Sequence, residues 1–293
     1  MDDTSTASVR IHVLGSGTPT PTPERFGSAF AIVVAGQTLM VDCGPAATAK
    51  LVQAGLWPTH VSELFLTHHH FDHNVDLPCF LLTRWDQSIG AEPPLRVHGP
   101  QPTSWMVDRL IGDDGAFHHD WQARVNAPVS QRVYVNRGGT LPRPKPSVET
   151  RDIVAGDTVT GEGWMMRTGH AQHVQPWLDS IAYRLETARG SVVFTGDTEP
   201  CPEIVELARG ADLLFCMCWA EQSEMDECGE APGQCGTRGA ARIAQRAGVK
   251  RLVLVHTGPH VSQGPNKQSA AAEVAAGFDG EVVFADELMC VDL

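Results

Sequence analysis

The chain has 293 residues, of which 42% are hydrophobic and 19% charged, a composition typical of a soluble globular protein with a substantial core. Its formal net charge is −13, and a surface this acidic repels phosphate backbones, so nucleic acid is an unlikely partner. No apolar run approaches the roughly 18 residues that a membrane-spanning helix needs, so no contact with a membrane is expected.

The cysteines and the start of the chain bear on the compartment. Eight cysteines are scattered without the spacing of a small disulfide scaffold, and the start MDDTSTASVR is unlike a secretory signal. A reducing, cytoplasmic environment is therefore expected. Because the chain has no internal repeat, low-complexity tract or long linker, we expect residues 1–293 to form a single domain.

The chain begins with apolar runs separated by turns. The runs Val9–Leu14, Ser28–Val34 and Gln37–Asp42 lie between loops rich in glycine and proline and predict three strands. A helix is expected over Pro45–Gly55, with proline near its start and glycine past its end. The apolar run Ser62–Thr67 predicts a further strand.

Farther along, helical and strand-like patterns alternate. Helices are expected at Asp76–Leu82, Thr103–Leu110, Pro202–Ala208, Thr237–Ala247 and Asn266–Ala276. Strands are expected at Leu95–His98, Gln131–Asn136, Trp164–Thr168, Ser180–Glu186, Ser191–Thr195, Leu213–Cys216, Arg251–His256 and Glu281–Phe284. The segment Gly99–Asp157 has the least regular pattern, and we expect loops there. Many strands mixed with surface helices favour an α/β fold in which helices cover the sheets.

The stretch THHHFDHNVD, at the end of the strand Ser62–Thr67, holds four histidines and two aspartates. Within it, His68, His70, Asp72 and His73 form the pattern H-x-H-x-D-H. Alternate residues of an extended chain face the same side, so the first two histidines can bind one ion while the later pair turns toward a second. Imidazole and carboxylate suit Zn²⁺ and similar metals. A solvated loop with accidental histidines would not explain so regular a pattern.

Further metal-binding side chains follow strands elsewhere in the chain. They are His170 and His173 in RTGHAQHVQPW, Asp197 in VVFTGDTEP and His256 in LVLVHTGPH. Because each of them follows a β-run, all can converge on one rim of the sheets. A carboxylate such as Asp197 can bridge two cations about 3.5–4 Å apart. The sequence therefore predicts a site for two metal ions.

Together, these motifs resemble those of the metallo-β-lactamase-fold hydrolase superfamily, over nearly the whole chain. VLGSGTPTPTPERFGSAF and LMVDCG are similar to the opening of its ribonuclease Z and arylsulfatase-like branch, HHHFDH to its signature, and FTGDT, SIAYRLE and LVLVH to later blocks. The resemblance implies a four-layer αββα sandwich, with two mixed β-sheets face to face and helices outside. It also implies a homodimer.

The resemblance further implies which residues bind the two Zn²⁺ ions of each chain. His68, His70 and His173 would bind the first ion, Asp72, His73 and His256 the second, and Asp197 would bridge them. His173 is preferred to His170 because HVQPWLDSIAYR has the family's usual distance to the YR block. Other divalent metals are possible in place of zinc.

Two cations lower the pKa of a shared water and so create a hydroxide nucleophile, which Asp72 is expected to orient. His260, four residues after His256, is a candidate proton donor or substrate contact, although a solvated loop histidine would also fit. Glu199, two residues after Asp197, is a candidate to support a metal ligand. The chain has no G-x-S-x-G motif, P-loop or dinucleotide fingerprint that would indicate other chemistry.

The sequence departs from the ribonuclease Z pattern at three places. Where ribonuclease Z has a strand ending in a His-Glu pair, this chain has Cys216 and Met217, neither of which suits a general acid. HTGPH replaces the usual His-Phe-Ser-x-Arg, and RGGTLPRPKPS is only a short basic loop in place of the long arm that grips tRNA. A tRNA 3′ endonuclease is therefore the alternative function and not the leading one.

Three tryptophans near the motifs, Trp85, Trp177 and Trp219, are candidates for an apolar pocket wall, although each is as readily explained by core packing. The leading expectation is a dinuclear zinc hydrolase of a small, apolar molecule, with aromatic molecules included. The bond would be an ester, a lactone, a sulfate or, as in chlorothalonil hydrolase of this branch, a carbon–chlorine bond of an aromatic ring. A non-catalytic, metal-dependent binding module is a third interpretation.

Overall fold

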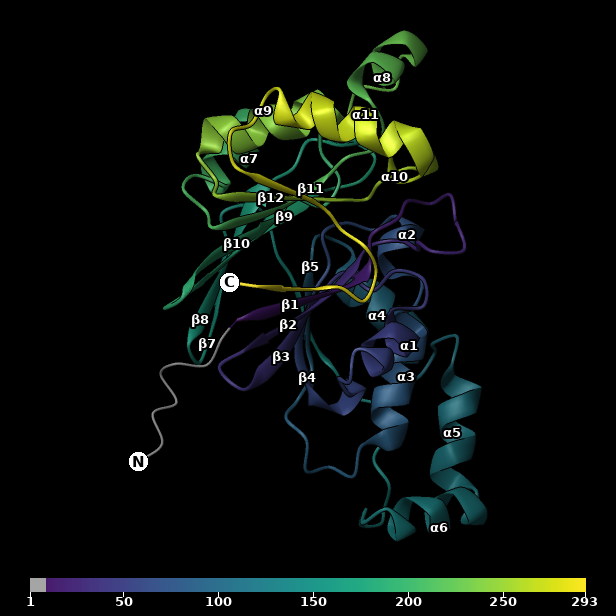
Figure 1. Cartoon of the computed structure of the whole chain (residues 1–293). Helices are drawn as coiled ribbons and strands as arrows, with labels where there is room; N and C mark the ends of the chain where they lie inside the picture. Colours follow the sequence, from purple (N-terminus) through teal and green to yellow (C-terminus); the bar gives the residue numbers. More distant parts are fainter. Residues whose placement is uncertain (1–8) are drawn as a thin grey trace.

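The computed structural model describes residues 9–293, and in them two seven-stranded β-sheets lie face to face (Figure 1). The first sheet has the order β14 (Cys290–Asp292), β1 (Arg10–Gly15), β2 (Ala29–Val34), β3 (Gln37–Val41), β4 (Val61–Phe65), β5 (Arg96–Gly99) and β6 (Glu149–Asp152). The second has the order β13 (Glu281–Phe284), β12 (Arg251–Val255), β11 (Leu213–Met217), β10 (Gly190–Phe194), β9 (Ile181–Thr187), β8 (Trp164–His170) and β7 (Thr158–Gly161).

Both sheets are mixed. In the first, β1 pairs antiparallel with β14 and β2, and β2 with β3, whereas β3 to β6 pair in parallel. In the second, β7 to β10 pair antiparallel and β10 to β13 in parallel. The parallel halves direct the carboxyl ends of their strands toward one rim, and ligand sites of α/β sheets commonly lie at such a rim.

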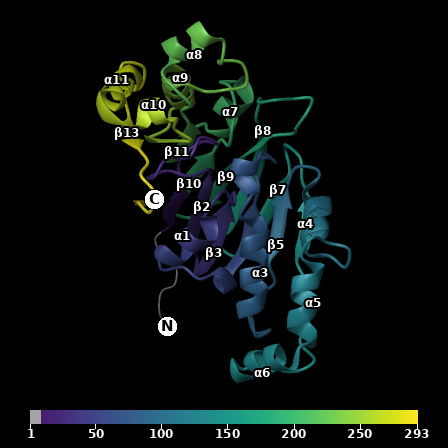
Figure 2. The same cartoon turned by 90° about the vertical axis from the view of Figure 1, so that its right-hand side faces the viewer.

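Helices form the two outer layers (Figures 1 and 2). The side of the first sheet carries α1 (Ala47–Gln53), the short η2 (Pro58–His60), α2 (Phe71–Asn74), α3 (Leu77–Gln87), α4 (Thr103–Ile111), α5 (His118–Asn126) and α6 (Pro128–Asn136). The side of the second carries α7 (Pro202–Leu207), α8 (Gln222–Cys228), α9 (Thr237–Ala247), α10 (Pro259–Ser262) and α11 (Gly264–Ala275). In the described part of the chain, no helix combines the length and apolarity needed to cross a bilayer.

Apolar side chains fill the three interfaces between these layers. Between the sheets, the rings of Phe30, Phe194 and Phe215 pack with centroids 5.0–5.4 Å apart. Leu51 and Phe80 join the cluster beneath the helices of the first sheet, and the alanine-rich face of α9 packs on the second. The chain is thus the four-layer αββα sandwich that the sequence predicts.

One element is of the wrong type in the sequence prediction. Residues 131–136, expected as a strand, form the last two-thirds of α6. The valines around Tyr134 favour a strand locally, but Pro128 starts a helix and Tyr134 packs into the protein while Val133 and Val135 stay exposed. The segment Gly99–Asp157, expected as loops, contains α4, α5 and α6, of which α5 and α6 project beyond the sandwich (Figures 1 and 2).

Candidate metal centre

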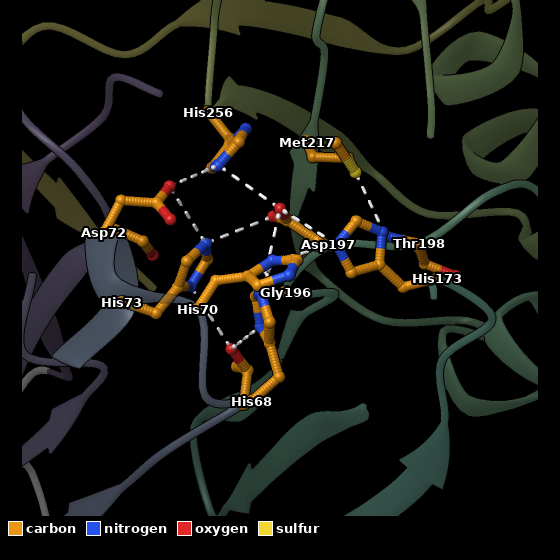
Figure 3. A network of polar contacts seen from close by, with 12 residues as sticks. His68, His70, Asp72, His73, His173, Gly196, Asp197, Thr198, Met217 and His256 are labelled. Carbon is orange, nitrogen blue, oxygen red and sulfur yellow. Dashed lines mark hydrogen bonds and ion pairs between the residues drawn. The ribbon is translucent and has the colours of Figure 1, made fainter. Parts of the chain in front are cut away.

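The residues that the sequence analysis selected as metal ligands come together at one rim of the sandwich (Figure 3). His68 and His70 follow β4, Asp72 and His73 lie in α2, and His173 lies in the loop after β8. Asp197 follows β10, and His256 follows β12. Four regions of the chain therefore supply one cluster, although up to 188 residues separate its members, as between His68 and His256.

Three histidines and Asp197 form the first group. Nδ1 of His70 lies 3.1 Å from Nε2 of His68 and 3.2 Å from Nε2 of His173. Oδ2 of Asp197 lies 3.9 Å from Nε2 of His68 and 3.8 Å from Nε2 of His173. Four donor atoms thus converge on one point, as in a tetrahedral metal site.

Asp72, His73 and His256 form the second group, beside the first. Oδ2 of Asp72 lies 3.1 Å from Nε2 of His256 and 3.6 Å from Nε2 of His73. Asp197 also reaches this group, because its Oδ1 lies 3.3 Å from Nε2 of His73 and its Oδ2 lies 3.3 Å from Nε2 of His256. Asp197 therefore stands between the two groups.

The chemistry of these donors fits divalent cations. Nε2 of His73 and one carboxylate oxygen each of Asp72 and Asp197 are buried without a hydrogen-bond partner, which is costly unless a ligand is bound there. Each ring of the first group also directs a nitrogen at another ring nitrogen. A shared cation between these lone pairs satisfies all of them at once.

The electrostatics of three members of the cluster, His68, His70 and Asp197, suit the same role. Burial lowers the pKa of His68 well below its usual range and also lowers the pKa of His70, so both rings are neutral and carry a free lone pair. Burial would raise the pKa of Asp197, but the neighbouring His256 and His73 outweigh it and hold this pKa well below its usual range. The carboxylate is therefore ionised and available to a cation.

Asp42, at the end of β3, positions two of the histidines. Its Oδ2 lies 2.7 Å from Nδ1 of His73. Oγ1 of Thr67 donates to Asp42 and lies 3.1 Å from Nδ1 of His68. Both Nδ1 atoms thereby have an acceptor, which leaves each Nε2 facing the cluster. The sequence analysis did not find Asp42, although it follows a predicted strand in the quoted block LMVDCG.

His173 is held by the loop between α8 and α9. Its Nδ1 lies 2.7 Å from the carbonyl oxygen of Gly233, and the amide of Gly233 donates to Oε2 of Glu199 at 2.7 Å. The amide of His173 donates to Oε1 of Gln175 at 2.8 Å. Glu199 thus supports a ligand through Gly233, in line with the sequence-based hypothesis, whereas nothing in the sequence indicated Gly233.

Four further candidate residues differ in their exposure and in how near they lie to the cluster. His170 faces a separate surface hollow with Arg184 and Glu203 and is not part of either group. Trp219 lies beside the cluster, with its ring centroid 6.0 Å from that of His256. Trp177 is exposed on the loop that carries His173. His260 is exposed on α10, and its role stays a prediction.

Trp85 lies on α3 and packs against the loop after α6. It follows Asp76 by nine residues, which is about 14 Å along the helix. Its Nε1 donates to the carbonyl oxygen of Pro144 at 3.0 Å, and the guanidinium carbon of Arg143 lies 4.2 Å from its ring centroid. These contacts place Trp85 against the loop after α6, and its role in a pocket wall stays a prediction.

Comparisons with known proteins agree with this geometry. The sequence model of the Metallo-beta-lactamase superfamily matches residues 22–256. A ribonuclease Z of Mycobacterium bovis is 30% identical over 294 residues, covering 97% of this chain and 98% of its own length.

Two solved structures are similar in fold. The metallo-beta-lactamase fold protein YhfI of Bacillus subtilis superposes with a TM-score of 0.73 at 20% identity, over 98% of this chain and 100% of its own. The short form of human tRNase Z superposes with a TM-score of 0.64 at 21% identity, over 96% and 98%.

The fold, the cluster and these matches define a metal-dependent hydrolase, whose fold implies a divalent metal, typically zinc. The chain belongs to the metallo-β-lactamase superfamily, and its relatives place it with the ribonuclease Z branch.

Proposed function

We propose that the chain is a two-metal phosphodiester hydrolase of the ribonuclease Z type, acting on RNA. The two-metal part of the proposal rests on the position of Asp197, whose carboxylate lies within 3.9 Å of nitrogens of both donor groups. The substrate class is supported by the relatives named ribonuclease Z, which match the chain almost end to end. This reverses the ranking expected from the acidic net charge, which had made RNA an unlikely partner.

The proposed ligand roles follow the two groups. One Zn²⁺ would be held by His68, His70 and His173. The other would be held by Asp72, His73 and His256. Asp197 would contact both ions. When bound, the metals would supply a hydroxide at neutral pH and neutralise the charge that develops on a phosphoryl group. Other divalent metals fit the same nitrogen and oxygen donors.

The protein's own side chains would orient the reactants. Oδ1 of Asp72 is buried and free of hydrogen bonds, so it can accept a hydrogen bond from the attacking water and fix its direction. Asp42 would keep the ring of His73 in one tautomer. His260 remains the candidate proton donor to the leaving group, because it lies on the helix directly after His256.

A second candidate function is hydrolysis of a small ester, lactone, sulfate or chlorinated aromatic. Met217, at the end of β11, favours it, because its sulfur accepts a hydrogen bond from the amide of Thr198 at 3.0 Å and cannot donate a proton. A substrate with a leaving group that departs without protonation would suit such a site. Trp219 would then form part of the pocket wall.

We further propose that the enzyme works in the cytoplasm, as a homodimer. All eight cysteines are free thiols in the described residues, which suits a reducing compartment. Sedimentation or light scattering of the purified protein tests the dimer.

The discriminating experiment is a substrate comparison with zinc-loaded protein. A precursor tRNA with a 3′ trailer, a simple aryl phosphodiester and a panel of esters, lactones, sulfates and chlorinated nitriles are tested in parallel. The proposal predicts chelator-sensitive cleavage of the precursor at its 3′ side and of the aryl phosphodiester, and loss of both in an Asp72→Ala variant. Turnover of an ester or lactone with neither phosphodiester cleaved would instead establish the second candidate.

A further inference from the structure

The candidate metal centre opens to solvent at His70. Its other ligands are buried: His68, Asp72, His73 and His256 are 0–3% exposed, and the side chain of Asp197 is 5% exposed. The side chain of His173 is also buried, whereas His70 is intermediate. The cluster is therefore most accessible to a substrate at His70.

Two exposed aromatic side chains belong to the segments that meet at this opening. Phe71 directly follows His70 and is 57% exposed. Trp177 follows His173 by four residues and is 89% exposed, and His173 Nε2 lies 3.2 Å from Nδ1 of His70. Large aromatic side chains are usually buried, so two such residues beside a site point to ligand contact.

The turn that carries Trp177 is held in place by hydrogen bonds. The amide of Trp177 donates to the carbonyl oxygen of Val174 at 3.1 Å. Gln175 donates to the carbonyl oxygen of Ala171 at 2.8 Å and accepts the amide of His173 at 2.8 Å. Trp177 is thus presented by the same turn that fixes a metal ligand, which makes its position dependent on the site.

The two ligand segments at the opening supply no positively charged side chain to a substrate. Neither of the two ligand segments, residues 67–76 and 171–180, contains a lysine or arginine. Bound metals would attract the scissile phosphate, but the neighbouring phosphates of a chain would find no cation on these segments. An aromatic face binds a base without needing charge, and it does so with any base.

We propose that Trp177, together with Phe71, stacks on the unpaired nucleobase next to the scissile phosphate. The substrate class is then a phosphodiester that carries a nucleoside on at least one side, and the two aromatic residues set this specificity. The inference rests on the proposed phosphodiesterase function, and it specifies which part of the substrate the protein recognises.

Two substrates with the same leaving group test the inference. Thymidine 5′-(4-nitrophenyl phosphate) carries a base, and methyl 4-nitrophenyl phosphate does not. The zinc-loaded wild-type enzyme should prefer the first in kcat/KM. In Trp177→Ala this preference, taken as the ratio of kcat/KM for the two substrates, should fall by about 5- to 150-fold, the range expected for loss of one base–aromatic stack.

Matched variants separate stacking from a general effect. Trp177→Phe should keep most of the preference, and Phe71→Ala should lose part of it. Trp57→Ala is the control, because Trp57 is 44% exposed but precedes β4, at the end of the strand opposite the ligands. An unchanged preference in Trp177→Ala, or equal wild-type rates on both substrates, would overturn the stacking inference alone. A wild-type enzyme that hydrolyses neither diester while retaining zinc would overturn the proposed function itself.

Discussion

Oδ2 of Asp42 lies 2.7 Å from Nδ1 of His73, and both side chains are almost completely buried. The same carboxylate accepts the backbone amide of Thr67 at 2.8 Å. It therefore links the end of β3 to the start of the ligand segment after β4, and it fixes which nitrogen of His73 faces the cluster. The candidate metal centre depends on this relationship as much as on the candidate ligands themselves.

Asp42→Asn should lower the affinity for zinc about 10- to 100-fold, the usual effect of losing a carboxylate behind a ligating histidine. The amide has the same shape, but it is a weaker acceptor and can present an N–H group to His73. Competition with a chromogenic chelator measures the affinity. Ser28→Ala is the control, because Ser28 Oγ donates to Asp42 at 2.9 Å and Ser28 is not itself a candidate ligand. An Asn variant that binds zinc like wild type would refute the role of Asp42.

Gly233→Ala should displace His173 and weaken the first metal group. A Cβ at Gly233 would lie 2.2 Å from the carbonyl oxygen of His173. Gly229 provides a matched control, since its φ of +73° equals the +74° of Gly233 within a degree and a Cβ there meets nothing within 4 Å. Both alanines carry the left-handed backbone cost of about 1–2 kcal/mol. Elemental analysis should show zinc loss in Gly233→Ala alone, and equal zinc content in both would contradict the prediction.

Glu63→Gln should destabilise the fold in a pH-dependent way. Burial opposes ionisation of Glu63, but hydrogen bonds from His98 and Arg96 outweigh it and lower the pKa of this carboxyl. A lowered pKa in the folded state contributes stability above the unfolded pKa of about 4.3, and this contribution is lost as the pH falls through the folded pKa.

The substitution should therefore cost about 2–3 kcal/mol at pH 7, with a smaller difference from wild type at pH values below about 4. Urea unfolding at a series of pH values measures both. A difference that stays constant over this range would mean that ionised Glu63 contributes nothing. The hydrogen-bonded pair of Glu63 and His98 matters for the candidate site because it joins β4 to β5 just before the ligand segment, residues 67–76.

Removal of metal should lower the melting temperature of the wild-type protein. Binding to the folded state at a hundredfold excess over Kd stabilises by about 2.7 kcal/mol, and the buried acceptors and lone pairs of the cluster would lose their partner. Calorimetry with and without EDTA measures the shift. Removal of metal should change the melting temperature of Asp197→Asn much less, because Asp197 contacts both donor groups. Equal shifts in the two proteins would place the stabilising metal elsewhere.

The gathering of the candidate ligands was predictable because each of them follows a run that forms a strand, and strand ends gather at one rim, whereas the choice of His173 over His170 came from the family resemblance. His173 and His256 illustrate this, as they are far apart in sequence and close in space. Asp42 was not recognised because a single aspartate after a strand has many ordinary explanations. Its left-handed backbone, with φ 59°, and its contact with His73 appear only in three dimensions.

Other misses arose where local sequence and tertiary packing disagree. The run around Tyr134 has the composition of a strand, yet one buried ring and an N-terminal proline settle it as a helix. Trp85 follows the ligand motif in sequence, but its ring packs against the loop after α6, where its Nε1 donates to the carbonyl oxygen of Pro144. The contact between Gly233 and His173 depends on a turn whose path no local pattern encodes.

The most direct test of the account is the metal content of the zinc-loaded protein after gel filtration, compared with His173→Ala and His256→Ala. The two histidines lie in different donor groups. We expect two zinc ions per chain in the wild type and one fewer in each variant, with loss of phosphodiester hydrolysis in both. A wild-type protein that retains no zinc, or whose zinc content is unchanged by both substitutions, would contradict the two-metal centre.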